Sequence, residues 1–535
     1  MQLMAWREEA GRWVGRLGRQ VNDAGRWANG DGRQWVSWLG RGLIALGAGI
    51  LGLLLGRTLV SPTTWTLPIT YVGIGLHIML ILLNPVLGFL LWIITSPFGR
   101  FLYQVITMGS GVPDLTLDRI VVVFLFVLLL AQGAVGLRRW TRFGKVDTMN
   151  LIYVGLMGLS VGASMLSTMS AIQNWVDYYV VPFLVFILAK NLICNRNDLR
   201  SGLQAVIIVA LYMAFLATNE QLTGTIWFQP PDRMVMYTQD VRRVVSLLGN
   251  PGFLALVMNM AAPFVAYLLV KARSRLRKLL YLLILLGLGV GVFMCYNRSG
   301  WVGFGLALLV MAVFSPKFRR YFIPALVAAG IIVAVAGTAI LANPRIAQRL
   351  FAQGPIEYRV TTLNVVWAMW RDHFWSGVGL GNFPFYYSRY EYWDPLLRAT
   401  PTPHNSYLFV AVTAGLPAAV AYVLVFVFFI YETVRLYLRA GEQTFPDRTM
   451  IAALWGAMAS YLAASLVMDC ILGIYPTMVL NLIMGMTLGA WQGHVLPPPG
   501  KGSGRDRQAV NGSLAPSGSG ADGQAQFPSP LRGEG

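Results

Sequence analysis

The stretch ATPTPHNSYLFVAVTAGLPAAVAYVLVFVFF, residues 399–429, decides the fold class. From Asn405 onward it is an apolar segment longer than the roughly 18 residues needed to cross a bilayer. Apolar and polar residues do not alternate along it, which excludes a strand of a membrane β-barrel. One histidine, His404, stands directly before the apolar segment, and Pro401 and Pro403 stiffen its approach. The stretch predicts a membrane-spanning helix with an ionisable ring at its entrance.

The same apolar character extends along the chain. Of its 535 residues 56% are hydrophobic and only 12% are charged, about half the charge of an ordinary soluble protein. We therefore expect an all-α, polytopic integral membrane protein with about 12–14 transmembrane helices. The expected spans lie near 42–60, 67–83, 86–97, 119–137, 150–168, 176–193, 201–218, 251–270, 279–296, 300–314, 321–341, 405–430, 450–468 and 476–491. The pair around Asn84 and Pro85 is either one kinked helix or two short ones.

The net charge of +19 fits a membrane protein better than a nucleic-acid-binding one. Lysine and arginine gather in short loops between apolar runs, as the positive-inside rule requires of cytoplasmic loops. This pattern places residues 342–404 in one long loop on the opposite, periplasmic side. The three cysteines have no motif spacing, which excludes a disulfide framework and a thiolate metal site.

We expect three regions along the chain. Residues 1–41 form a cytoplasmic arm rich in Arg and Trp, which is either a helix lying on an anionic membrane face or a disordered arm. Residues 42–491 form the membrane domain. Residues 492–535, rich in Pro, Gly and Ser, form a disordered cytoplasmic tail.

Four arginines are expected at helix ends or in the long loop on the outer side, where charge is usually functional: Arg242, Arg243, Arg298 and Arg359. A guanidinium offers a planar fork of donors that matches phosphate oxygens. Converging arginines at a membrane surface indicate a site for a lipid-linked phosphate or diphosphate. No metal-binding motif appears, so we expect neither a metal nor a cofactor. For Arg298 the alternative is snorkelling to lipid headgroups.

His404 is the candidate catalytic base. A histidine titrates near neutral pH and can accept a proton from an attacking hydroxyl. Asn405 or Ser406 is a natural N-cap, so His404 stands at a helix N-terminus whose dipole favours the neutral ring. The alternative is a histidine that only caps or hydrogen-bonds locally.

An ordered set of motifs resembles the superfamily of O-antigen ligases and O-antigen polymerases. The motifs are GVPDLTLDRI (111–120), NEQLTG (219–224), RVVSLLGNPG (243–252), NRSGWVGFGLALL (297–309), SGVGLGNF (376–383) and PHNSYLFVAVTAGLPAAVAYVLV (403–425). One departure is that Asn-Arg-Ser-Gly stands at Arg298 where the family usually has Ser-Arg-Gly.

The resemblance implies a metal-independent, inverting glycosyltransferase with a GT-C-like fold in the bacterial inner membrane. Such enzymes take a glycan from an undecaprenyl diphosphate donor on the periplasmic side. By position, His404 corresponds to the family's base and Arg298 and Arg243 to its diphosphate-binding arginines, while Arg359 lies in a variable loop. Ligases use an acceptor sugar of lipopolysaccharide, polymerases a second lipid-linked repeat, and other relatives a protein. A transporter of a lipid-linked sugar is the alternative outside this superfamily.

Overall fold

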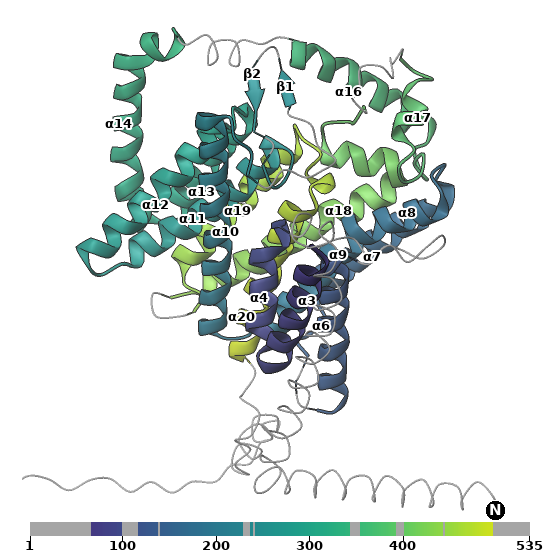
Figure 1. The fold of residues 1–535 in the computed structure, drawn as a ribbon, viewed down its shortest axis with the longest axis horizontal. Helices are drawn as coiled ribbons and strands as arrows, with labels where there is room; N and C mark the ends of the chain where they lie inside the picture. Colours follow the sequence, from purple (N-terminus) through teal and green to yellow (C-terminus); the bar gives the residue numbers. More distant parts are fainter. Residues whose placement is uncertain are drawn as a thin grey trace, which may run out of the picture.

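The protein, in a computed structural model, is a bundle of helices with one two-stranded hairpin in the part of the chain that is described (Figure 1). The described residues are 66–98, 116–136, 138, 140–227, 236–238, 241–244, 246–342, 354–391, 401–441 and 445–495. The expected arm, the expected span at 42–60 and the tail from residue 496 lie outside them. The strands are β1 (Met236–Thr238) and β2 (Val241–Arg243). The helices are α3 (Thr66–Leu83), α4 (Pro85–Thr95), α6 (Leu117–Ala134), α7 (Lys145–Leu159), α8 (Thr168–Trp175), α9 (Val181–Leu192), α10 (Arg196–Thr223), α11 (Pro251–Lys271), α12 (Arg275–Met294), α13 (Arg298–Phe314), α14 (Pro316–Leu341), α16 (Gly354–Asp372), α17 (Phe383–Tyr387), α18 (Ser406–Arg439), α19 (Arg448–Ser465) and α20 (Ile474–Val495).

Each expected apolar span from residue 67 onward overlaps a helix, although the one at 150–168 runs past the end of α7 at Leu159. The prediction of an all-α polytopic membrane protein is confirmed. Within the described ranges, seven helices are long and apolar enough to cross a membrane by themselves. The open question at Asn84 is resolved in favour of two helices, because Asn84 caps the start of α4 and its side chain accepts the Leu87 N–H at 3.1 Å. The long segment between α14 and α18 also contains helices, α16 and α17.

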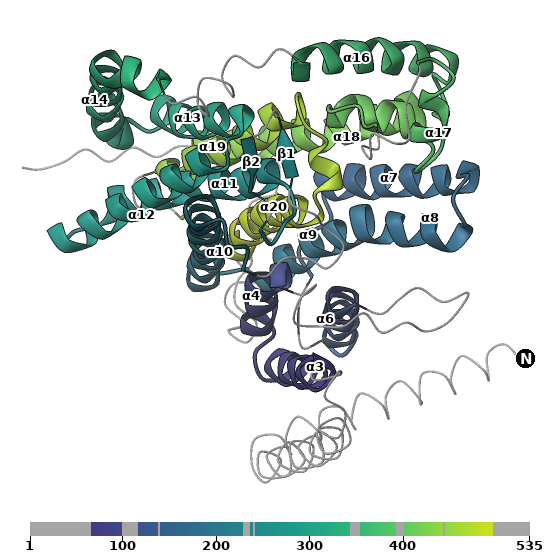
Figure 2. The same cartoon turned by 45° about the horizontal axis from the view of Figure 1, so that its top comes forward.

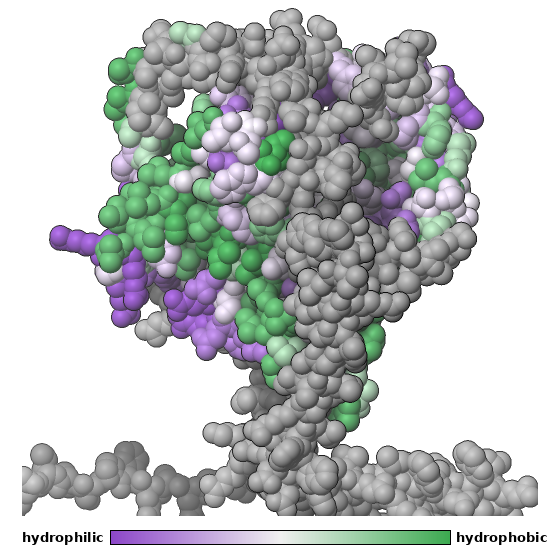
Figure 3. Space-filling view, viewed as in Figure 1, coloured by the Kyte–Doolittle hydropathy of each residue, from purple (hydrophilic) through white to green (hydrophobic). Residues whose placement is uncertain are grey.

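The lipid-facing surface is clearest on α12. Leu276, Leu279, Leu283 and Leu286 are each more than half exposed on this helix. Figure 3 shows a mostly hydrophobic surface over α10, α11 and α12, bordered below by hydrophilic residues. Apolar side chains exposed over such an area are stable only against lipid, which fits a helix at the edge of a membrane bundle.

The centre of the bundle is built by α11 and α20, the most buried of the apolar helices. On α20, Gly485 and Gly489 let the helix approach α9 closely: a Cβ at these positions would lie 2.4 Å from the Phe186 carbonyl oxygen and 2.2 Å from that of Lys190. Small residues at such contacts are typical of membrane helix packing. Figure 2 shows α16, α18 and α7 stacked in successive layers beside this centre.

Helix α18 is broken at Gly415, where the backbone adopts φ 78° and ψ −179°. The sequence predicts one continuous span here, so the break is a feature that only the structure reveals. It frees backbone groups that bind the glycine-rich segment before α17. The hydrogen bonds run from Val378 N–H to Val412 O (2.7 Å), from Gly379 N–H to Thr413 O (2.9 Å) and from Leu416 N–H to Phe374 O (2.9 Å).

Gly415→Ala is expected to destabilise the protein by about 3 kcal/mol. A Cβ at this position would lie 2.0 Å from the Trp375 carbonyl oxygen, and the backbone conformation there strongly disfavours any side chain. Thermal unfolding in detergent micelles measures the effect. Gly305→Ala is the control, because a Cβ at Gly305 meets nothing within 4 Å. Equal unfolding temperatures for the two variants would contradict the expectation that only glycine fits at position 415.

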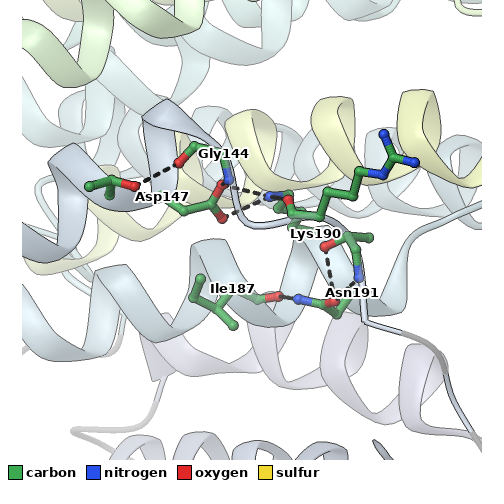
Figure 4. A network of polar contacts seen from close by, with 8 residues as sticks. Gly144, Asp147, Ile187, Lys190 and Asn191 are labelled. Atoms are coloured by element: carbon green, nitrogen blue, oxygen red, sulfur yellow. Dashed lines mark hydrogen bonds and ion pairs between the residues drawn. The ribbon is translucent and has the colours of Figure 1, made fainter.

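A buried ion pair joins α7 to α9 (Figure 4). The Lys190 ammonium donates to both carboxylate oxygens of Asp147, at 2.8 and 2.7 Å, and to the Arg142 carbonyl oxygen at 2.7 Å. Asp147 also accepts the Gly144 N–H at 2.8 Å. Both side chains are at most 2% exposed. The network therefore attaches the segment before α7 to two helices of the bundle.

Asp147→Ala is expected to lower stability by about 3–5 kcal/mol, because it leaves the Lys190 charge buried without a partner. The double variant with Lys190→Met should recover much of that loss, since it removes both charges. Lys271→Ala removes the partner of Asp447, but the Lys271 side chain is 39% exposed, against 1% for Lys190. This variant should therefore lose much less stability than Asp147→Ala. Unfolding temperatures of the three variants check these expectations, and a double variant no better than Asp147→Ala would refute them.

Candidate active site

A cavity of about 180 Å³ opens at the end of the bundle where α11, α13 and α18 begin. Four of the residues that the sequence singled out line it, although they come from four separate segments of the chain. The lining residues are Arg243, Asn250, Asn297, Arg298, Ser299, Tyr358, Arg359, His404, Val467 and Met468. The structure thus brings His404 together with three of the four arginines.

The fourth arginine, Arg242, lies beside Arg243 in β2, where its backbone pairs with Tyr237 of β1. Its side chain is outside the described part of the chain. The hairpin places the backbone of Arg243 at one edge of the cavity, next to the segment that leads into α11.

Asparagine N-caps begin all three helices at the cavity. The side chain of Asn250 accepts the Gly252 N–H at 2.8 Å, that of Asn297 accepts the Gly300 N–H at 3.0 Å, and that of Asn405 accepts the Leu408 N–H at 3.0 Å. An α-helix carries about half a positive charge at its N-terminus. Three such termini beside three arginines make the cavity strongly positive, which suits an anion.

His404 is oriented by a buried carboxylate. Its backbone N–H donates to Asp469 Oδ2 at 3.0 Å, and the Asn405 N–H donates to Asp469 Oδ1 at 3.0 Å. The His404 Nδ1 atom lies 3.7 Å from Asp469 Oδ2. The ring of Tyr358 meets the imidazole edge-on, with centroids 5.8 Å apart. These contacts fix the backbone of His404 and place Nδ1 on the side of the ring that faces Asp469.

The segment that carries Asp469 is itself fixed by hydrogen bonds to α18 and α20. Ser406 Oγ donates to the Met468 carbonyl oxygen at 3.0 Å and accepts the Cys470 N–H at 2.9 Å. Thr477 Oγ1 donates to the Cys470 carbonyl oxygen at 3.0 Å. The Asp469 carboxylate therefore belongs to a turn that α18 and α20 both fix by hydrogen bonds.

Backbone strain concentrates around the cavity. Among the described residues, the only non-glycine residues with positive φ are Ser246 (30°), Tyr296 (47°) and His404 (51°). Each lies at or within three positions of a cavity residue, either Arg243, Arg298 or His404 itself. The Ser246 N–H is held by the buried Glu220 carboxylate at 2.9 Å. Strained backbone of this kind costs about 1–3 kcal/mol a residue and clusters at functional sites.

Burial lowers the pKa of His404 below its ordinary value, Asp469 raises it in part, and Arg359 and Arg243 lower it further. The pKa of Asp469 is raised by burial, against the opposing effects of His404 and of the N–H groups that it accepts. The pKa of Arg359 is lowered by burial and by the charge of Arg298. The ring is therefore neutral at neutral pH, which is the form that accepts a proton. Sequence reasoning expected this form from the helix dipole, whereas in the structure burial is the largest cause.

Asp469 is the residue of this site that sequence reasoning missed. It lies 65 positions after His404, and no local motif links the two. His373, a second histidine in the segment between α14 and α18, packs its ring against that of Tyr386, with centroids 5.2 Å apart.

A comparison with known protein families gives one match, over part of the chain. Residues 281–423 match the family model described as O-Antigen ligase. The matched segment includes Arg298, Arg359 and His404, while Arg243 precedes it and Asp469 follows it. No curated protein matches the chain. Over these residues the chain is similar to the O-antigen ligase family.

Proposed function

We propose that the protein is a glycosyltransferase that moves a glycan from a polyprenyl diphosphate donor to an acceptor hydroxyl. One observation carries the proposal: Arg243, Arg298, Arg359 and three helix N-termini surround a single cavity that also contains His404. Burial lowers the pKa of this histidine, which favours its neutral form. This combination suits a reaction in which a diphosphate leaves while a hydroxyl loses its proton.

The positive groups supply the donor site. Arginines form paired, charge-assisted hydrogen bonds with phosphate oxygens, and helix N-termini add backbone N–H groups. The pKa of Arg359 is lowered partly by Arg298, so the two guanidinium groups repel each other. A bound diphosphate removes that repulsion, and the site therefore favours an anion with more than one negative charge.

The reaction is a single displacement. His404 takes the proton of the acceptor hydroxyl, and the acceptor oxygen forms a bond to the anomeric carbon of the donor sugar. The bond from that carbon to the diphosphate oxygen breaks, and the diphosphate leaves with the electron pair. The arginines stabilise the charge that develops on the leaving group. The glycan is transferred with inversion at the anomeric carbon.

The distribution of basic residues supports a periplasmic site. Helix α11 begins at the cavity and ends at Lys271, and α12 begins at Arg275 and returns. Likewise α18 runs from the cavity to Arg439, and α19 starts at Arg448. By the positive-inside rule the ends that carry Lys and Arg face the cytoplasm. We infer that the cavity faces the periplasm from the inner membrane of a bacterium.

The decisive experiment is reconstitution of the purified full chain with an undecaprenyl diphosphate-linked glycan and a candidate acceptor. Formation of the glycosylated acceptor with release of undecaprenyl diphosphate supports the proposal. Movement of the donor across sealed vesicles without product would instead indicate a transporter. In cells, deletion separates two acceptor classes: long lipid-linked chains accumulate after loss of a ligase, and single repeats after loss of a polymerase.

Asp469→Asn is expected to slow transfer and to shift its acid limit to lower pH. Asparagine keeps one oxygen acceptor for the backbone N–H groups but removes the charge that raises the His404 pKa. His404 then loses its proton at a lower pH, so the neutral base persists further into acid. The pH profile of the transfer rate, measured from pH 4 to pH 8, tests this expectation. A shift of the acid side of the profile to higher pH would contradict it.

A further inference from the structure

A second cavity, of about 40 Å³, lies inside the membrane bundle, away from the arginine site. Its walls come from α7, the π-helical turn Val176–Val180, α9, α18, α19 and α20. The lining is rich in hydroxyl and amide groups. These groups belong to Asn150, Tyr153, Tyr178, Tyr179, Tyr422, Tyr461, Thr477 and Asn481.

The side chains of this cavity include buried polar atoms without a hydrogen-bond partner among the described residues. Among these atoms are Nδ2 of Asn150, a residue that is 6% exposed, and the hydroxyl of Tyr179, a residue that is 2% exposed. An unpaired donor in a membrane interior costs several kcal/mol, because lipid offers it no alternative. Both groups therefore require a polar ligand inside the cavity.

The backbone that carries Tyr179 is irregular where it borders the cavity. A π-helical turn, Val176–Val180, interrupts the helix between α8 and α9 and contributes both Tyr178 and Tyr179 to the wall. Turns of this type are rare and occur often at functional sites. The ring of Tyr153 packs between those of Tyr179 and Tyr422, at 5.9 and 5.1 Å, and keeps this wall in place.

We propose that this cavity is a binding site for a small cluster of water molecules. One water molecule occupies roughly 10–15 Å³ of cavity volume, so a cavity of about 40 Å³ holds about three water molecules. A sugar or a lipid headgroup is too large for it. The water molecules accept hydrogen bonds from Asn150 Nδ2 and from the Tyr179 hydroxyl. The cluster also borders Tyr461 and Thr477, whose hydroxyls lie 3.1 Å apart, and Thr477 donates to the Cys470 carbonyl oxygen. The buried water is thus linked to the turn that carries Asp469.

Hydroxyl radicals generated from water by X-rays test the site in the full chain in lipid nanodiscs. Tyr153 and Tyr179 should be labelled several times faster than Tyr475. Tyr475 is an equally buried tyrosine whose hydroxyl donates to the Ile93 carbonyl oxygen at 2.7 Å. Labelling of Tyr153 and Tyr179 no faster than that of Tyr475 would overturn the proposal.

A second test replaces Asn150 with an apolar residue of similar size and asks whether the unfolding temperature falls or rises. Asn150→Leu should lower the unfolding temperature if water is bound, because the cluster loses a partner. In a dry cavity the same change removes an unsatisfied donor and should raise or preserve the unfolding temperature. Tyr179→Phe is the parallel variant, with the same expected sign. A raised or unchanged temperature in both variants refutes bound water, whatever the activity of the enzyme.

Discussion

His404→Ala should abolish glycan transfer while the protein still folds in the membrane. Removal of a positioned general base typically slows a reaction by about 10²–10⁴-fold. His404 is the only histidine among the residues that line the arginine cavity, so no other imidazole there can take over its role. The transfer rate of the reconstituted variant measures the effect.

His373→Ala is the matched control for that experiment. His373 belongs to the same part of the chain, but its ring packs on Tyr386. We expect its variant to transfer glycan at close to the normal rate. Both variants should elute from a sizing column as the unsubstituted protein does. Normal transfer by His404→Ala in this setting would remove the histidine from the proposed mechanism.

Arg298→Ala should reduce the transfer rate by about 10²–10³-fold, the effect of removing one positioned donor from a developing anion. Arg298 is the first residue of α13, beside the N-cap Asn297, so its side chain adds to the positive end of that helix. Arg298→Lys should recover only part of the rate, because an ammonium keeps the charge but lacks the planar fork.

Arg277→Ala serves as the control for charge alone, because Arg277 lies in the first turn of α12 at the opposite end of the bundle. It should transfer glycan normally. The rates of the variants and their affinities for the donor, measured side by side, separate binding of the diphosphate from stabilisation of its departure. Unchanged rate and affinity in Arg298→Ala would exclude this arginine from the donor site.

Much of the fold is predictable because each membrane span carries its own signal. Long apolar runs place the helices, and loops rich in Lys and Arg separate them, so the expected spans from residue 67 onward overlap helices. Local chemistry also limits the N-cap of α18 to Asn405 or Ser406, and the structure shows that it is Asn405. The break of α18 at Gly415 was not predictable, because an apolar run with one glycine and one proline is compatible with a continuous membrane helix.

For the candidate site too, one part could be predicted from the sequence and another part only the tertiary structure revealed. The sequence alone singled out His404 and four arginines, because a charged or ionisable residue close to a long apolar segment can be recognised from the order of residues. In the structure His404 and Arg298 stand at helix starts, whereas Arg243 lies in β2 and Arg359 inside α16. Only the tertiary structure decided that Arg243, Arg298, Arg359 and His404 share one cavity, and that Asp469 holds the histidine. The physical reason is that helix formation depends on neighbouring residues, whereas the distances between helix ends depend on packing between segments far apart in the chain.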